Sequence, residues 1–131
     1  MKIFLSIKYH TDHSNRALIE QISAALEANG HPTICIARDL EHWGKDHYPP
    51  QELMRLTFER IRLCDCILVE LSEKGVGVGI ETGYAVALGK PVWVIARSGS
   101  DISDTLRGIA KHVFTYNNLQ KLKSIFSELS T

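Results

Sequence analysis

Short apolar segments alternate with amphipathic segments along the whole chain, and no other feature constrains the fold as strongly. The apolar segments are rich in β-branched residues and are too short for buried helices, so we interpret them as strands. These predicted strands cover residues 2–7, 33–36, 66–71, 92–96 and 112–116. The segments between them place apolar side chains three and four residues apart, as helices do. The predicted helices run from Asp12 or Ser14 to just before Gly30, from about Gln51 to Cys64, from Glu81 to Leu88, from Ser103 to Ile109, and from Asn118 onward.

This alternation gives five strand–helix units joined mostly by short links. Such units form a parallel sheet with right-handed crossovers and helices on both faces. We therefore predict an α/β, flavodoxin-like (Rossmann-like) three-layer sandwich whose five-stranded parallel sheet has the order 2-1-3-4-5. Because the 131 residues contain no internal repeat and no linker-like segment, we expect a single domain over residues 1–131.

The charge composition narrows the class of partner. The chain has 15 basic and 15 acidic residues and no net charge, whereas proteins that bind DNA or RNA polymers concentrate Lys and Arg. We therefore expect no nucleic acid polymer as a partner, although backbone N–H groups can still hold the phosphate of a small nucleotide. No apolar run approaches the length of a membrane span, and Cys35, Cys64 and Cys66 lack the spacing of a disulfide framework or a metal site. We expect reduced thiols, no membrane contact and a cytoplasmic location.

The connection between residues 36 and 51 is unusually long and mixes aromatic with charged residues. It follows the second predicted strand, at the carboxyl edge of the sheet, where open α/β proteins bind their ligands. Loops of this length are functional or disordered, so two interpretations stay open: a lid over a ligand crevice, or a flexible surface loop. Trp43 and Tyr48 either stack on the base of a ligand or anchor the loop.

The most informative segment lies between the third predicted strand and the helix predicted from Glu81. Gly75, Gly77 and Gly79 alternate there, and glycine lets a backbone approach a ligand while leaving N–H groups free for an anion. The segment lacks the Gly-Lys-Ser/Thr of a Walker A motif and the third glycine of the dinucleotide fingerprint. We expect Glu81 in the first turn of the helix, where the helix dipole keeps a carboxylate ionised. It either only complements that dipole or acts as a nucleophile.

Two stretches of the chain carry a family resemblance. They are Asp65-Cys66-Ile67-Leu68-Val69-Glu70-Leu71 and Gly75-Val76-Gly77-Val78-Gly79-Ile80-Glu81-Thr82-Gly83-Tyr84-Ala85, the latter continuing to Gly89-Lys90-Pro91. This pattern resembles the nucleoside 2-deoxyribosyltransferase family, with most likeness to its branch of 2'-deoxynucleoside 5'-monophosphate N-glycosidases. The likeness is strongest over residues 53–96.

The resemblance implies a flavodoxin-like fold, a homodimer or dimer of dimers, a small nucleoside or nucleotide as substrate, and no metal or organic cofactor. It also implies cleavage of an N-glycosidic bond. In that family the glutamate matching Glu81 attacks C1' and forms a glycosyl-enzyme, which water or a second base then resolves. This logic is similar to that of retaining glycoside hydrolysis.

The chain departs from the family's pattern at several positions. An aspartate that positions the sugar and handles the proton of the leaving base is matched by Thr57, on the inward stripe of its predicted helix. A polar residue that contacts the 5' end of the sugar is matched by Gly75, and a glycine-rich turn after the first strand is replaced by residues 8–13. Ser103 matches a serine that reaches the phosphate of the neighbouring subunit in family dimers.

The first strand and the turn after it supply further candidates. His10 either provides the acid or base that Thr57 lacks, since histidine titrates near neutral pH, or is an exposed loop histidine. His10 and His13, like His42 and His47, lack the partners of a metal site. We count Ser6 and Tyr9 among the substrate-binding residues, together with Trp43, Gly75, Gly77, Gly79 and Ser103.

We therefore predict an enzyme that cleaves or transfers the N-glycosidic bond of a (deoxy)nucleoside or nucleoside 5'-monophosphate through a covalent intermediate on Glu81. Thr57 and His10 are the other candidate catalytic residues. Two alternatives stay open. Because Thr57 and Gly75 replace polar groups, the chain can instead be a non-catalytic module that binds or senses a nucleotide. A glutamate on this kind of fold can also serve a glycohydrolase that cleaves NAD.

Overall fold

A computed structural model describes residues 1–129 and contains one five-stranded parallel sheet with the order β2-β1-β3-β4-β5. The order and the parallel pairing confirm the topology predicted from the sequence. The strands are β1 (Ile3–Ile7), β2 (Thr33–Ile34), β3 (Cys66–Glu70), β4 (Val92–Arg97) and β5 (His112–Tyr116). The helices are α1 (Arg16–Ala28), α2 (Ile36–Asp39), the 3-10 helix η1 (His42–Gly44), α3 (Pro50–Arg62), α4 (Val76–Ala87), α5 (Asp104–Ile109) and α6 (Leu119–Glu128).

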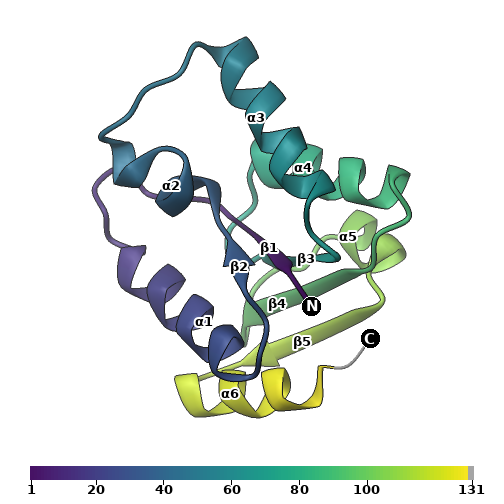
Figure 1. Cartoon of the computed structure of the whole chain (residues 1–131). Coiled ribbons are helices and arrows are strands. Elements are labelled where there is room, and N and C mark those ends of the chain that lie inside the picture. The colour runs from purple at the N-terminus through teal and green to yellow at the C-terminus, as the bar shows by residue number, and fades with distance from the viewer. Residues whose placement is uncertain (130–131) are drawn as a thin grey trace.

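Successive side chains of each strand point to opposite faces of the sheet, and this alternation builds two separate cores. Ile3 and Leu5 of β1 pack with α1 and α6, whereas Phe4 packs with α3 and α4. Figure 1 shows the resulting three layers, with α1 and α6 on one side of the sheet and α3, α4 and α5 on the other. Ser6 therefore faces α3 and α4, and Glu70, at the end of β3, faces α1 and α6.

Three predicted element boundaries are wrong. Helix α1 is capped at Asn15, not at Asp12 or Ser14; the Asn15 amide instead holds the preceding loop through Lys8 O at 2.7 Å and His10 N at 2.9 Å. Strand β2 ends at Ile34 because the chain turns into α2 at Ile36. The connection after β2 is thus partly helical, with α2 and η1 followed by residues 47–49, which have no regular secondary structure.

The third difference concerns the glycine-rich segment. Helix α4 starts at Val76, although glycine inside a helix costs roughly 1 kcal/mol relative to alanine. Val78, Thr82 and Ala85 are buried against the sheet, and this packing outweighs the poor helix propensity of Gly77 and Gly79. Glu81 consequently lies in the second turn of α4, not in the first.

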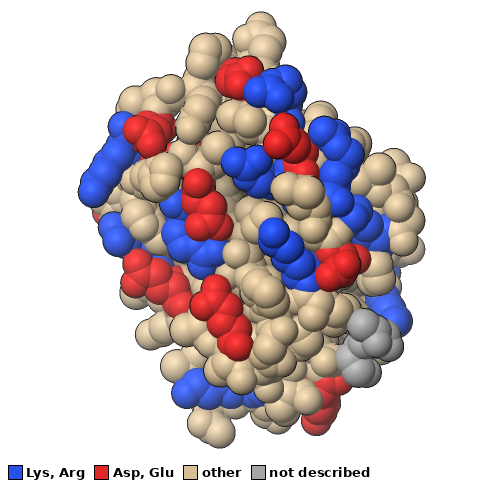
Figure 2. All heavy atoms as spheres, viewed as in Figure 1, with Lys and Arg blue, Asp and Glu red and all other residues tan. Residues whose placement is uncertain are grey.

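Charged residues of both signs are mixed on the visible face of the molecule (Figure 2), and the thiols are unpaired. Figure 2 shows Lys and Arg side chains interspersed with Asp and Glu over the visible face, with no extended region of one sign. Cys35, Cys64 and Cys66 are free and buried. Among residues 1–129, no helix is long and apolar enough to cross a membrane.

Candidate active site

A cavity of about 430 Å³ opens at the carboxyl ends of β1 and β2, between the segment that follows β2 and helices α3 and α4. Four parts of the chain line it: the loop after β1, the segment around α2, the buried side of α3 and the start of α4. The lining residues are Leu5, Ile7, Lys8, Tyr9, Thr11, Cys35, Ile36, Ala37, Glu41, Leu53, Met54, Thr57, Gly75, Val76, Gly77, Val78 and Glu81. This position, next to the central strand β1, is where open α/β sheets bind ligands.

Glu81 reaches the cavity from α4 and is held by β1. The Ser6 hydroxyl donates a hydrogen bond to Glu81 Oε1 at 2.6 Å, and Ser6 itself is buried. Burial raises the pKa of Glu81 to about 7, while the Ser6 hydrogen bond opposes the rise and the nearby charge of Glu41 adds to it. Glu81 is therefore a carboxyl group that titrates near neutral pH and that has one oxygen fixed in place.

The sequence-based expectation for the ionisation of Glu81 is wrong in direction. A first-turn position would have kept the carboxylate ionised through the helix dipole, but that effect falls off beyond the first turn. Glu81 lies further along α4, and burial dominates its pKa. An ionised Glu81 thus becomes abundant only above about pH 7.

Thr57 also faces this cavity, as its place on the inward stripe predicts, but its hydroxyl hydrogen already takes part in a hydrogen bond. The Thr57 hydroxyl donates to Leu53 O of the preceding turn of α3 at 2.7 Å, and Thr57 is buried. Its oxygen can accept a hydrogen bond from a ligand hydroxyl. It cannot at the same time protonate a leaving group.

Cys35 is a further potential nucleophile in the cavity lining. Burial raises the pKa of its thiol to about 11, so the reactive thiolate is scarce at neutral pH. Glu81 is therefore the stronger nucleophile candidate of the two.

The predicted glycines do not all belong to the cavity. Gly75 and Gly77 line it, and Gly79 does not. A Cβ on Gly75 would meet the Lys8 side chain at an ordinary 3.7 Å, and a Cβ on Gly77 would meet nothing within 4 Å. The surroundings of Gly75 and Gly77 thus have room for a Cβ atom, and the lack of side chains at these two positions keeps this part of the cavity open.

Of the three aromatic candidates, Tyr9 lines the cavity, whereas Trp43 and Tyr48 do not. The Trp43 ring packs on Tyr9 with centroids 5.6 Å apart, and the Arg16 guanidinium lies 4.4 Å from the Trp43 ring centroid. Trp43 also adopts a left-handed backbone (φ 60°), which is costly for a bulky residue and needs such packing to persist. This arrangement favours the interpretation of Trp43 as a loop anchor.

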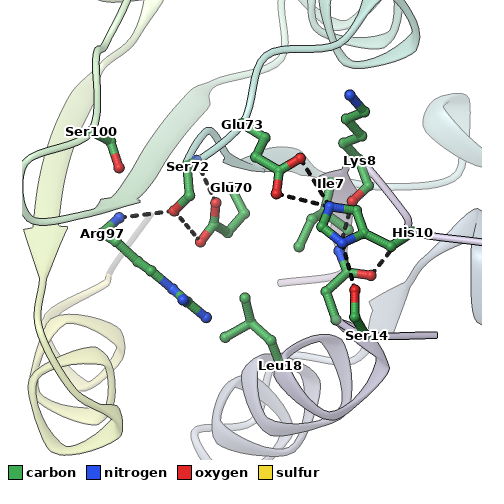
Figure 3. Close-up of a pocket in the computed structure, with 11 residues that line it drawn as sticks. Ile7, Lys8, His10, Ser14, Leu18, Glu70, Ser72, Glu73, Arg97 and Ser100 are labelled. Carbon is green, nitrogen blue, oxygen red and sulfur yellow. Dashed lines mark hydrogen bonds and ion pairs between the residues drawn. The ribbon is translucent and has the colours of Figure 1, made fainter. Parts of the chain in front are cut away.

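His10 lies in a second cavity of about 320 Å³, lined also by Lys8, Glu70, Ser72, Glu73 and Arg97. Figure 3 shows its imidazole between Glu73, 2.8 Å from Nε2, and the Ser14 hydroxyl, 2.7 Å from Nδ1. The expectation that His10 complements Glu81 is therefore not met, since both imidazole nitrogens are engaged elsewhere.

The buried carboxylate of this second cavity escaped the sequence analysis. Glu70 accepts hydrogen bonds from Ser72 N at 2.6 Å, from the Ser72 hydroxyl at 2.8 Å and from the Tyr116 hydroxyl. It belongs to the face of the sheet opposite Ser6, which separates it from Glu81. These contacts tie β3 to β5 and give Glu70 a structural role.

Ser103 precedes α5 and lines neither cavity. Among residues 1–129, no three His, Cys, Asp or Glu side chains are grouped so that they could hold a metal ion.

Sequence reasoning missed one acidic residue of the first cavity, namely Glu41. It lies between α2 and η1 and lines the same cavity as Glu81. Burial raises the pKa of Glu41, and His47 opposes the rise. A single acidic residue in a long loop gives no periodic signal, so only the position of the cavity could have revealed it.

Comparison with known proteins decides the family. The sequence profile of the nucleoside 2-deoxyribosyltransferase family matches residues 3–122. The chain belongs to this family. Its members are N-hydrolases and transferases that cleave or transfer the N-glycosidic bond of nucleosides and nucleotides.

Individual relatives agree with this assignment. A Thermofilum pendens protein, provisionally assigned as 2'-deoxynucleoside 5'-phosphate N-hydrolase 1, is 28% identical over 113 residues, which are 83% of this chain and 78% of that protein. The 5-hydroxymethyl-dUMP N-hydrolase of Mus musculus is 42% identical over 52 residues, 38% of this chain and 30% of the mouse protein.

Solved structures of low sequence identity show the same fold. The CMP N-glycosidase of Clostridium botulinum superposes with a TM-score of 0.74 at 20% identity, covering 98% of this chain and 100% of that one. A 2-deoxyribosyltransferase from Bacillus psychrosaccharolyticus gives 0.73 at 14% identity, covering 99% and 93%.

The Ser6–Glu81 hydrogen bond leads to a testable prediction. The exchange Ser6→Ala removes a donor that favours the Glu81 carboxylate, so the pKa of Glu81 should rise further above about 7. We expect kcat/KM for base release at pH 7 to fall roughly 10- to 100-fold, as for the loss of a hydrogen bond to a charged group, with the ascending limb of the pH profile moved to higher pH.

Ser23→Ala is the matched control, because Ser23 is also a buried serine but its hydroxyl has no partner among residues 1–129. Unchanged pH profiles for both variants, measured from pH 5 to 9, would show that Ser6 does not act on Glu81.

Proposed function

We propose that Glu81 is the nucleophile of an N-glycosidase that acts on a nucleoside 5'-monophosphate and releases the free base. The observation that carries the proposal is a buried carboxyl group, fixed by Ser6 in the cavity at the carboxyl ends of β1 and β2, whose pKa of about 7 lets it ionise near neutral pH. Family membership supports the class of reaction.

The proposed chemistry uses two steps. Ionised Glu81 attacks C1' of the sugar as the bond from C1' to the base nitrogen breaks, which forms a glycosyl ester on Glu81. Water, or a second base in a transferase, then attacks C1' and releases Glu81. In this proposal the Thr57 oxygen, which can accept but not donate a hydrogen bond, binds a sugar hydroxyl; its place in the cavity lining supports that role.

The preference for a 5'-phosphate has two supports. Two relatives are named for hydrolysis of nucleoside 5'-phosphates, one of 2'-deoxynucleoside 5'-phosphates and one of 5-hydroxymethyl-dUMP. In this chain, Lys8 and the start of α4 at Gly75 and Gly77 line the cavity, and a lysine ammonium together with backbone N–H groups is suited to a phosphate. Tyr9 is the aromatic residue available there for a base or a sugar.

A homodimer belongs to the same proposal. Apart from Glu81, α4 has no charged residue, and the exposed apolar side chains Val76, Ile80 and Val86 lie along it, followed by exposed Leu88. An apolar helix face of this kind is typical of a protein interface. Ser103, which lines neither of the two cavities described above, is then available to a neighbouring subunit. The proposal includes a cytoplasmic location, which the free, buried thiols support.

The test is a chromatographic assay of base release. Wild type and Glu81→Gln are incubated with deoxyribo- and ribonucleosides, their 5'-monophosphates and NAD, each with and without a second free base. We expect release from 5'-monophosphates by the wild type, and none above background by Glu81→Gln.

The remaining outcomes distinguish the alternatives. Formation of a new nucleotide with the added base would identify a transferase, and release of nicotinamide from NAD alone would identify an NAD glycohydrolase. Binding of an intact nucleotide, measured by calorimetry without any turnover, would contradict the enzymatic proposal in favour of a sensing module.

A further inference from the structure

A nucleobase needs a proton when it leaves, and Glu81 cannot supply that proton. When the C1'–N bond breaks, its electron pair goes to the base, and a neutral base leaves readily only if it is protonated at the same time. Glu81 must be ionised to attack, so it holds no proton. A second group that carries a proton has to lie in the same cavity.

Of the other polar side chains that line the cavity, Lys8 is assigned to the phosphate in the proposed function, and the hydroxyl and thiol groups are weaker acids than a carboxyl group. The Thr57 hydroxyl donates to Leu53 O, and the Tyr9 hydroxyl is hydrogen-bonded to His13 Nδ1. Burial raises the pKa of Cys35 to about 11, which makes the thiol a reluctant acid. His10, the donor expected from the sequence, lies in the second cavity, between Glu73 and Ser14.

Glu41 lies in the right place to protonate the leaving base, and its carboxyl group is not engaged by another described residue. Its backbone is fixed, because its N–H donates to Ile36 O at 3.0 Å and its carbonyl accepts from Gly44 N and Asp46 N, both at 3.0 Å. Its half-buried side chain lines the cavity together with Glu81. Within residues 1–129, the Glu41 carboxyl takes part in no hydrogen bond and no ion pair.

We propose that Glu41 is the general acid and base of the reaction: it protonates the leaving base and later takes a proton from the attacking water. This inference rests on the proposed function of Glu81. It assigns the acid role to a residue on the segment after β2, in a chain where the polar α3 side chain at the cavity is Thr57.

The proton balance closes over the two steps. In the first step, Glu81 forms a bond to C1', the C1'–N bond breaks, and the Glu41 proton goes to the base. In the second step, water attacks C1', the bond to Glu81 breaks, and Glu41 takes one water proton. The products are the free base and the sugar phosphate, and both carboxyl groups return to their starting states.

Glu41 and Glu81 are electrostatically coupled. The charge of Glu41 helps to raise the pKa of Glu81 to about 7, so the resting pair holds a shared proton mainly on Glu81, and the reactive form is the one in which that proton is on Glu41. Two carboxyl groups in one partly desolvated cavity oppose each other's ionisation, so the pair retains one proton over a range of pH. The Ser6 hydroxyl donates a hydrogen bond that stabilises charge on Glu81, whereas the Glu41 carboxyl accepts no hydrogen bond within residues 1–129 and only the charge of His47 favours its ionised form. The other titratable groups that face the cavity or act on Glu41 are Lys8, Tyr9, Cys35 and His47. The Leu53, Met54 and Thr57 side chains of α3 add none.

The test compares leaving groups that do and do not need a proton. Wild type, Glu41→Gln and Glu81→Gln are assayed with guanosine and deoxyguanosine 5'-monophosphates, with their N7-methylated forms and with nicotinamide mononucleotide. The N7-methylated nucleotides and nicotinamide mononucleotide carry a cationic base, which departs as a neutral molecule without protonation. We expect Glu41→Gln to lose at least about 100-fold in kcat/KM on the neutral bases, to stay within about threefold of wild type on the cationic ones, and to lack the descending alkaline limb of the pH profile.

Asp46→Asn is the matched control, because Asp46 lies in the same segment, is exposed, and pairs with His42 at 2.6 Å outside the cavity. Equal loss on both classes of substrate, or no loss on either, would overturn the role of Glu41 while Glu81→Gln still loses both. If the wild type releases neither class of base, the proposed function itself fails, and the role of Glu41 falls with it.

Discussion

Glutamine at position 81 is expected to lower kcat/KM for base release by roughly 10³- to 10⁶-fold, the range found when a covalent nucleophile is removed. The amide has nearly the same size as the carboxyl group and can still accept the hydrogen bond that Ser6 donates at 2.6 Å. The fold and the cavity should therefore persist, and only the nucleophile is lost. The measurement is base release under single-turnover and steady-state conditions at pH 8, where the wild-type carboxyl is mostly ionised.

The control for this exchange is Glu59→Gln, since Glu59 on α3 pairs with Arg55 and Arg60 and does not line the cavity. Its activity should equal that of the wild type. Wild-type activity should also rise with pH through about 7, as the attacking carboxylate forms. Retention of more than a tenth of the activity by Glu81→Gln, with the circular dichroism spectrum unchanged, would show that Glu81 is not the nucleophile.

The architecture was accessible from the sequence because it follows from short-range patterns. Buried parallel strands are continuous apolar runs, and the helices between them repeat every three to four residues. Five such units allow few topologies, and the predicted order is the observed one. The start of α4 was not accessible by the same reasoning. Propensity argues against a helix through Gly77 and Gly79, and the packing of Val78 and Ala85 on the sheet overrides it.

The site was only partly accessible, because its decisive contacts join distant parts of the chain. The glycine-rich pattern identified Glu81, but its contact with Ser6 spans 75 positions in the sequence. Glu41 sits in a loop whose path no periodicity describes. The direction of the Glu81 pKa depends on burial, which a sequence does not report, and the position beside the helix start pointed the wrong way.

The buried Glu81 carboxyl should also make the protein less stable as the pH rises, and Glu81→Gln should remove that effect. A carboxyl whose pKa is higher in the folded state than in the unfolded state contributes stability below its unfolded pKa, near 4.5, and loses it as the pH rises through about 7. The difference between 4.5 and about 7, at about 1.4 kcal/mol per pH unit, corresponds to about 3 kcal/mol. We expect the free energy of unfolding of Glu81→Gln, relative to wild type, to increase by about that amount between pH 4.5 and pH 8.

The measurement is urea unfolding of both proteins at several pH values, because the difference between them cancels the titration of the six histidines and the other carboxyl groups. Glu59→Gln, at an exposed ion pair, should follow the wild type at every pH within about 0.5 kcal/mol. A difference between Glu81→Gln and wild type that stays constant with pH would mean that Glu81 ionises in the folded protein as it does in the unfolded chain. In that case, burial of the Glu81 carboxyl would not lower the free energy of unfolding. A difference that grows with pH would instead show that the protein keeps a buried, ionisable nucleophile at the expense of its own stability.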